Sequence, residues 1–392
     1  MQKIIADKEM KILAFTGGTG WNTYVRELMH RTSFVSYAIP TSDNGGSTAV
    51  ILKFHGGPAI GDIRSRLIRL AGNTLPQVTN LLSYRLPKDE NFARKEWGSI
   101  LDFSHNLWEG IDDAQKYFLG AHLRTFEVHT NIRTIERHSK FSYENGSIGN
   151  FFFTGSRLYS GSLETAIWEF SRIVGISENT EVLPVLSSNQ EATLSALFTD
   201  GTRLVGQHEI SHPGTLDSRS SDEKFSTKFK EVYYSDCYGN RLPVLANPKI
   251  IERINNCNMF IYSPGSLATS LMPSIIVGGV GETIYQRNIP KVLILNTKRD
   301  RETSQIRNKR EYVDFAVNGF TQFKLKKQIR RSLTSSYITH IIEPVNSVWN
   351  EGSKKMTIKG IDSISLKTEQ GNGMDIYPEK GLIDILQRIY EG

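Results

Sequence analysis

Three loops built from small and acidic residues hold the groups of this chain that could bind phosphate. They lie at residues 16–20, 40–48 and 263–270. Small residues let backbone N–H groups approach phosphate oxygens, and helix N-termini attract anions. The first loop is neither the G-x-G-x-x-G dinucleotide fingerprint nor the G-x-x-x-x-G-K-[ST] loop of NTPases. Alone, it is also explained by a tight turn between a strand and a helix.

Two carboxylates stand beside these loops, and each has a structural alternative. Asp43 and Asn44 could coordinate a metal or orient a hydroxyl, although Asp-Asn-Gly is also an ordinary turn. Asp62 could join Asp43 at the site or serve as the N-cap of a helix over residues 63–71. Arg64, one turn inside that helix, is a better candidate for an anion clamp than Arg66. Either arginine could instead be solvated.

Histidine chemistry has little support in the sequence. The nine histidines contain no HExxH or other metal-binding spacing. His55 is the one whose neighbours suggest a site, because it lies between the second loop and Asp62. The stronger expectation is that His55 is a loop histidine exposed to water.

Alternating strand and helix patterns place the three loops. An apolar run at residues 11–15, a helix over 21–30 and a second apolar run at 34–39 have the spacing of a βαβ unit. Further helices are predicted over residues 151–158, 163–174, 250–256 and 378–390, and further strands over 182–186, 192–198, 259–262 and 291–295. Asp200-Gly201 predicts a hairpin turn.

This pattern predicts an α/β fold with a doubly wound, mostly parallel, Rossmann-like sheet and an added hairpin. We expect one domain over residues 1–392. A polar segment at about 213–243 lacks clean periodicity and predicts a mobile or partner-facing insertion. In open sheets of this kind, loops gather at the carboxyl edge of the strands, and ligands bind there.

Composition narrows the class of protein. The net charge of +6 is modest for 392 residues and is spread along the chain, which argues against a nucleic-acid partner. The two cysteines, Cys237 and Cys257, show neither zinc spacing nor a disulfide framework. We see no signal peptide and no run of about 20 apolar residues. We therefore expect a cytoplasmic protein without membrane contact, and leave a homodimer open.

An ordered set of motifs makes the chain resemble the CofD-like family. This family comprises the 2-phospho-L-lactate transferases of deazaflavin cofactor synthesis and the bacterial gluconeogenesis-factor proteins that bind UDP-sugars. The motifs follow the family's order over about residues 11–296 and are Gly17-Gly18-Thr19-Gly20, Ser42-Asp43-Asn44-Gly45-Gly46-Ser47, Gly61-Asp62-Ile63-Arg64, Ser147-Ile148-Gly149-Asn150, Asp200-Gly201-Thr202, Asn247-Pro248 and Pro264-Gly265-Ser266-Leu267 with Thr269-Ser270. The Asp-Asn-Gly-Gly-Ser form looks more like the gluconeogenesis-factor branch.

The resemblance implies a site for a nucleoside diphosphate or a UDP-sugar. Asp43 and Asp62 would hold Mg²⁺ or orient an acceptor hydroxyl. The implied ligand-contacting residues are Gly17, Gly18, Thr19, Gly20, Asn44, Gly45, Gly46, Ser47, Arg64, Asn150, Pro264, Gly265, Ser266 and Thr269.

The chain also departs from the family pattern. Trp21, Ala49 and Ser263 stand where the family usually has glycine, and Cys257-Asn258 replaces Ala-Asp. The loop at residues 296–303 is longer and more basic than expected, and residues beyond about 304 form a divergent extension. Ligand identity is therefore not transferred from the family.

Three function classes follow. The first is a nucleotide-sugar sensor or regulator that binds without turnover. The alternative is a Mg²⁺-dependent transferase with a nucleoside-diphosphate donor, since such transfer depends mostly on positioning and charge neutralisation. The third, a dinucleotide-dependent oxidoreductase, is disfavoured by the altered glycine fingerprint and by the missing acidic residue that would bind ribose.

Overall fold

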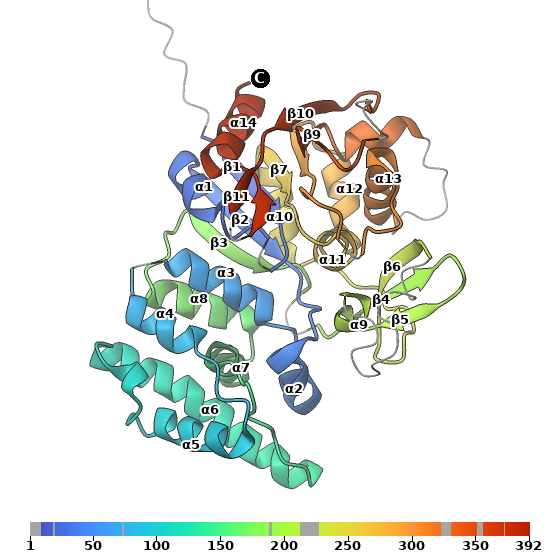
Figure 1. Cartoon of the computed structure of the whole chain (residues 1–392). Helices are drawn as coiled ribbons and strands as arrows, with labels where there is room; N and C mark the ends of the chain where they lie inside the picture. Colours follow the sequence, from blue (N-terminus) through green and yellow to red (C-terminus); the bar gives the residue numbers. More distant parts are fainter. Residues whose placement is uncertain are drawn as a thin grey trace, which may run out of the picture.

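A seven-stranded parallel sheet forms the centre of the molecule (Figure 1). The computed structural model describes residues 9–18, 20–72, 74–187, 190–211, 227–300, 302–322, 331–350, 356–371 and 373–392. The strand order is β10-β9-β8-β7-β1-β2-β3, with bounds β1 Lys11–Phe15, β2 Phe34–Ile39, β3 Thr180–Pro184, β7 Met259–Tyr262, β8 Lys291–Ile294, β9 His340–Pro344 and β10 Asp362–Leu366. Every pairing in this sheet is parallel, which confirms the predicted fold class.

The strand order reverses between β1 and β7. The chain runs outward from β1 through β2 to β3, and later from β7 to β10 on the other side. The loops that follow β1 and β7 therefore meet at the topological switch point, where α/β sheets bind ligands. β9 and β10 lie beyond residue 304, so the segment expected to be a divergent extension completes the central sheet.

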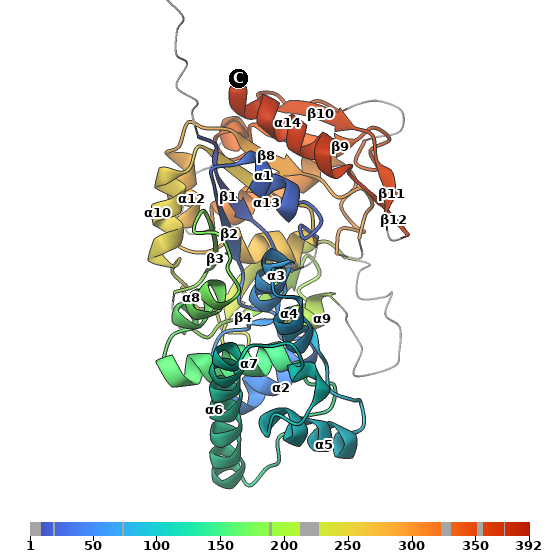
Figure 2. The same cartoon turned by 90° about the vertical axis from the view of Figure 1, so that its left-hand side faces the viewer.

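Helices cover both faces of the sheet, and most of the chain between β2 and β3 forms a helical lobe. In Figures 1 and 2, α5 and α6 lie farthest from the sheet, with α2 and α7 between. The helices before β3 are α1 Val25–Arg31, α2 Gly46–His55, α3 Gly61–Ala71, α4 Pro76–Ser83, α5 Glu90–Leu101, α6 Asp113–Arg137, α7 Ile148–Ser160 and α8 Leu163–Ile173. Those after it are α9 Gln207–Ser211, α10 Pro248–Asn256, α11 Met272–Ile275, α12 Val280–Tyr285, α13 Lys309–Phe320 and α14 Glu379–Glu391.

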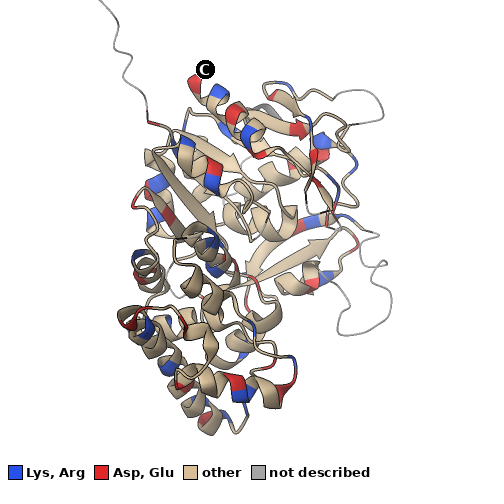
Figure 3. Ribbon diagram, turned by 60° about the vertical axis from the view of Figure 1, so that its left-hand side comes forward, with Lys and Arg blue, Asp and Glu red and all other residues tan. Residues whose placement is uncertain are grey.

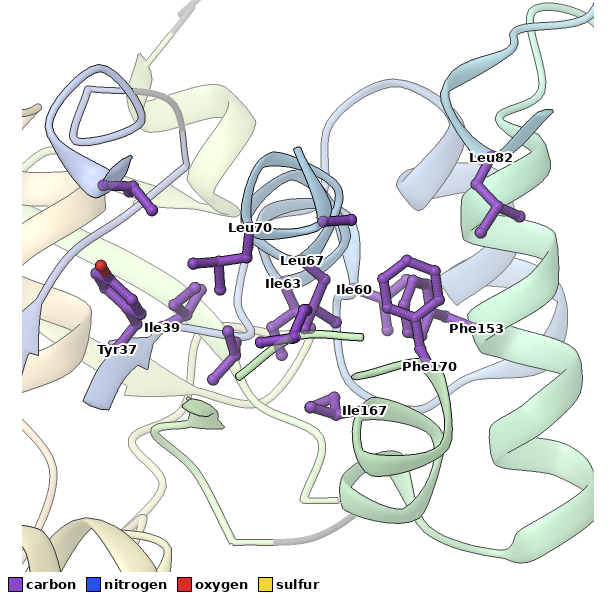
Figure 4. Packing of buried hydrophobic residues seen from close by; sticks show 14 of the residues in the cluster. Tyr37, Ile39, Ile60, Ile63, Leu67, Leu70, Leu82, Phe153, Ile167 and Phe170 are labelled. Atoms are coloured by element: carbon purple, nitrogen blue, oxygen red, sulfur yellow. The ribbon is translucent and has the colours of Figure 1, made fainter. Parts of the chain in front are cut away.

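Two hydrophobic cores lie on opposite faces of the sheet, as the two-residue period of a strand requires. Ile12 and Ala14 of β1 face the core shared with the helical lobe, whereas Leu13 and Phe15 face the other. Figure 4 shows the first core, where α3 inserts Ile63, Leu67 and Leu70 between the sheet residues Tyr37 and Ile39 and the aromatic rings of α7 and α8. This packing fixes α3 against the sheet, and so fixes the residues at its N-terminus.

A small antiparallel sheet lies beside the main one. Its order is β5-β4-β6, with β4 Thr193–Phe198, β5 Arg203–Val205 and β6 Phe229–Ser235. The β4–β5 pairing confirms the predicted hairpin. The polar segment at 213–243 is not irregular throughout, because β6 pairs with β4. Val232, Tyr233 and Tyr234 of β6 form a continuous buried run, and this short apolar run was overlooked. Residues 213–226 of that segment lie outside the described part.

The C-terminal helix packs against the first helix of the chain. The α14 residue Glu379 accepts a hydrogen bond from the backbone N–H of Glu27 in α1, at 3.3 Å. Arg31 of α1 lies 3.6 Å from Asp384 of α14. Helix α14 buries Leu382, Leu386 and neighbouring apolar residues in the same core as β1. A further hairpin, β11 Glu369–Gly371 with β12 Met374–Ile376, precedes this helix.

Candidate functional site

The first and third loops are packed directly against each other at two glycines. A Cβ on Gly17 would lie 2.6 Å from the Ser270 side chain, and one on Gly20 would lie 2.8 Å from the Pro264 carbonyl oxygen. Only glycine allows this approach. The predicted helix at 21–30 begins later than expected, at Val25. Thr19 lies outside the described residues.

The second loop leaves the N-terminus of α2 open. Asp43 Oδ1 accepts the Gly45 N–H at 3.0 Å. Gly45 precedes α2 and provides no side-chain cap, and Gly46 is exposed with a φ of 51°. The side chain of Asn44 bonds elsewhere, because its Oδ1 accepts the backbone N–H of His208 in α9 at 2.8 Å.

Asp62 faces the first loop and Asp43 rather than capping its own helix. Helix α3 begins at Gly61, after an N-cap residue, Ile60, that makes no side-chain cap, so the N-cap alternative for Asp62 is wrong. A Cβ on Gly18 would collide with Asp62 Oδ1. Burial raises the pKa of Asp62 to about 7, and the charge of Asp43 adds to the rise. Two carboxylates in one partly buried place repel each other in this way.

Helix α7 contributes a third N-terminus. Asn150, in the first turn of α7, is buried and donates through Nδ2 to Ser47 Oγ at 3.1 Å and to Thr48 Oγ1 at 3.3 Å. Its Oδ1 is buried without a hydrogen-bond partner in the described part of the chain. Arg64 Nη1 donates to Ser147 Oγ, the α7 cap, at 2.6 Å. Burial lowers the pKa of Arg64 to about 10.

The N-terminal turns of α2, α3 and α7 therefore meet beside Asp43 and Asp62. A Cβ on Gly61 would lie 3.1 Å from Thr48 Oγ1 and 3.6 Å from Asp43 Oδ2, which joins α3 to α2. A Cβ on Gly149 would lie 2.7 Å from Arg64 Cδ, which joins α7 to α3. Three positive helix ends facing two carboxylates can hold an anion and a divalent cation together.

The third loop differs, because an internal carboxylate already binds its amides. The N–H groups of Ala268 and Thr269 donate to Glu302 Oε2, both at 3.1 Å, and the Thr269 hydroxyl donates to Oε1. Gly265 is held through both backbone groups by Asn296, and Ser266 hydrogen-bonds Asp300. The positions predicted to cradle phosphate at Ser266 and Thr269 thus bind protein carboxylates.

Glu302 was missed by sequence reasoning. It is 5% exposed, and burial together with the charge of Asp300 raises its pKa to about 7. Ser211, at the end of α9, also donates to it at 2.9 Å. The available sequence signal was the acidic pair Asp300 and Glu302 after β8, at the same sheet edge as the glycine loops. The loop that contains this pair was interpreted as basic.

The expectation for His55 and the alternative of a solvated Arg66 were both wrong. His55 is buried at the C-terminal end of α2, away from the open end of that helix, and its Nε2 lies 2.9 Å from Thr130 Oγ1. Burial lowers its pKa to about 4. Arg66 is also not solvated: it is 0% exposed and lies over the Tyr37 ring.

The donor set fits Mg²⁺ only in combination with a ligand. Within the described residues, no three His, Cys, Asp or Glu side chains gather as a metal cluster. Mg²⁺ is commonly held by one or two carboxylates plus substrate phosphates, so Asp43 and Asp62 suffice when phosphate completes the shell. The unpartnered Asn150 Oδ1 gives a further oxygen near the same helix ends.

Neither a membrane span nor a strongly charged face is visible in the described part of the chain. No helix there is both long and apolar enough to cross a bilayer. In Figure 3, basic and acidic residues are interspersed over both halves of the molecule. Cys237 is exposed, Cys257 is buried, and both are free thiols.

Comparison with known proteins gives the family. The model of the family described as 2-phospho-L-lactate transferase CofD matches residues 12–368. The uncharacterized protein YNL011C of Saccharomyces cerevisiae is 32% identical over 357 residues, covering 75% of this chain and 79% of the relative. The gluconeogenesis factor of Bacillus subtilis is 23% identical over 286 residues, covering 73% of this chain and 67% of that protein.

A solved structure shares the fold. A member of the UPF0052 family from Bacillus halodurans superposes with a TM-score of 0.68 at 18% identity, covering 96% of this chain and 99% of that one. The family match extends beyond residue 304, where the sequence motifs could no longer be followed. Because that match spans nearly the whole chain, this protein belongs to the CofD family.

Proposed function

We propose that this protein binds a nucleoside-diphosphate-linked metabolite of the UDP-sugar kind, with its diphosphate between the N-terminal turns of α2, α3 and α7. The convergence of these three helix ends carries the proposal. The first turn of a helix has N–H groups without intrahelical partners and a positive dipole end, both of which favour phosphate. Glycines at the entrance of α2 leave room for the oxygens.

Magnesium would sit between Asp43, Asp62 and the diphosphate. A bound Mg²⁺ neutralises phosphate charge and fixes the geometry of the phosphate oxygens. The mutual repulsion seen in the raised pKa of Asp62 is relieved by a cation. Arg64, held by Ser147 at the start of α7, is then placed to approach the anion.

A cavity beside the second loop supports a neutral group on the diphosphate. It measures about 470 Å³ and lies between α2 and the small sheet. Ser42 and Asn44 line it on the loop side, while Glu191 and Asp236 line it on the sheet side. Among the described residues, its lining contains acids and no Lys or Arg. A hydroxyl-bearing sugar suits such a surface better than a second anion does.

The alternative is a Mg²⁺-dependent transferase, and the Asp43–Asp62 pair favours it. Transfer of a phosphorus-containing group requires mainly positioning and charge neutralisation, which these carboxylates with a metal would supply. The two functions differ in turnover. If the protein is a transferase, Asp43→Asn retains donor binding and abolishes product.

A thermal-shift panel tests the proposal. UDP-sugars, UDP, GDP and NAD are added with and without Mg²⁺ to the wild type, to Asp43→Asn, and to Asp384→Asn as an exposed control on α14. We expect a nucleoside diphosphate to stabilise the wild type and the control, with the Mg²⁺-dependent part lost in Asp43→Asn. No shift with any nucleotide would refute the proposal, and a shift with NAD alone would favour an oxidoreductase.

A further inference from the structure

Arg66 is a charged residue that lies fully buried in the protein interior. Its side chain is 0% exposed, and neither Nε nor Nη1 has a hydrogen-bond partner among the residues that the structure describes. No carboxylate forms an ion pair with it among the described residues, and burial lowers its pKa to about 10. Replacing a buried ion with an apolar side chain of similar volume is often neutral or stabilising. Stability of the fold therefore does not explain an arginine here.

Arg66 contacts the Tyr37 ring, and its hydrogen bonds within the described residues lie at the first loop. Its Nη2 donates to Thr16 Oγ1 at 2.9 Å and, over a longer 3.4 Å, to the Gly17 carbonyl oxygen. The Thr16 hydroxyl donates to that same carbonyl at 3.1 Å. On the next residue, the Gly18 N–H hydrogen-bonds the Asp62 carboxyl.

These contacts orient one peptide group. In a trans peptide the carbonyl and the following N–H point in opposite directions. Arg66 holds the Gly17 carbonyl and Asp62 receives the Gly18 N–H, so the peptide between Gly17 and Gly18 is held from both ends. Asp62 and Arg66 are four residues apart on α3 and therefore lie on one face of that helix.

We propose that Arg66 is a positioning residue of the nucleotide site, which sets the Gly17–Gly18 peptide and thereby the Asp62 carboxyl. This inference rests on the proposed function. Ligand affinity, rather than the free energy of unfolding, is then what the buried guanidinium serves. Arg66 does not touch the ligand, and it acts through the first loop.

The test compares Arg66→Met and Arg66→Lys with Arg69→Met. Arg69 is an exposed neighbour on α3 that donates to the Asn22 carbonyl, so it is a matched control. Three quantities are measured for each variant: the melting temperature, the affinity for UDP with Mg²⁺ by calorimetry, and hydrogen exchange in the peptide containing residues 16–20.

We expect Arg66→Met to melt at or above the wild-type temperature, to bind UDP with Mg²⁺ at least about tenfold more weakly, and to exchange faster in the first loop. Arg66→Lys keeps the charge but loses the guanidinium group that donates to both Thr16 and the Gly17 carbonyl. It should therefore recover only part of the affinity. Arg69→Met should match the wild type in affinity and loop exchange.

The outcomes separate this inference from the proposed function. A lower melting temperature in Arg66→Met with unchanged loop exchange and unchanged affinity would show a purely structural role and overturn the inference. If the wild type binds neither UDP nor another nucleoside diphosphate, the proposed function fails. Faster loop exchange without melting loss in Arg66→Met would then still support the positioning of the peptide, whereas unchanged exchange would overturn it.

Discussion

The two halves of the carboxyl edge of the main sheet carry similar loops, but the backbone amides of these loops have different partners. On the side of β1 and β2, the N-terminal turn of α2 has no side-chain cap and faces Asp43. On the side of β7 and β8, the amides of Ala268 and Thr269 are bound by Glu302. The N-terminal turn of α2 in the first half therefore lacks a side-chain cap, while the amides of the second half bind an internal carboxyl group. Small residues alone do not distinguish the two; the partner of the amides does.

The largest effect on ligand affinity is expected from a substitution that fills space in the first loop. In Gly18→Ala, the new methyl group collides with the Asp62 carboxyl. We expect nucleotide affinity to fall about 100-fold and stability by about 1–3 kcal/mol, as in overpacked sites. Calorimetry and urea unfolding measure both. Gly98→Ala is the control, because nothing lies within 4 Å of its Cβ and α5 should tolerate alanine. Unchanged affinity in Gly18→Ala would remove the first loop from the site.

Acid should weaken the helical lobe through His55. Burial, aided by the charge of Arg157, lowers the pKa of His55 in the folded state to about 4, below its unfolded value near 6.5. The unfolded chain therefore binds a proton first, and stability present above pH 6.5 is lost as pH falls toward 4. We expect His55→Gln to remove about 1–3 kcal/mol of this dependence, measured by urea unfolding between pH 7 and 4.5. The exposed His30→Gln should leave it unchanged.

A low pH should stabilise, rather than weaken, the β7–β8 side of the sheet edge, through Glu302. Burial raises the folded-state pKa of Glu302 to about 7, from an ordinary value of 4.5. Its contribution is therefore fully present below pH 4.5 and is lost as pH rises through 7. We expect Glu302→Gln to gain stability relative to the wild type over this range, by about 1–2 kcal/mol. Melting curves at pH 5 and 8 measure it, with the exposed Glu369→Gln as the control.

The same variant gives the smallest expected effect and the sharpest test of the comparison. If the third loop is internally capped, Glu302→Gln should change the affinity for a nucleoside diphosphate by less than about threefold at pH 8, as measured by calorimetry. A large loss would mean that the third loop binds the ligand directly, and that the two halves act together.

Sequence reasoning placed the strands of the first and third loops well, because each is a short apolar run ended by small residues. Strands β1, β2 and β7 match their predictions at both ends, and β8 within one residue. Helices α4 to α6 were not assigned, in part because α6 exposes Val128 and Ile135 and so blurs its apolar face. The open end of α2 was predicted as a site. The capping by Glu302 was not, since it depends on two loops that meet only after β7 and β8 pair.

The packing of α14 on α1 has a consequence for synthesis. The strand and helix that carry the first glycine loop are synthesised before residues 379–391, which form part of their outer layer. The unit formed by β1 and α1 therefore keeps an uncovered apolar surface until α14 has been synthesised. A chain stopped before α14 would leave the first core open, so chaperone dependence and proteolytic clearance should be concentrated in such late-truncated products.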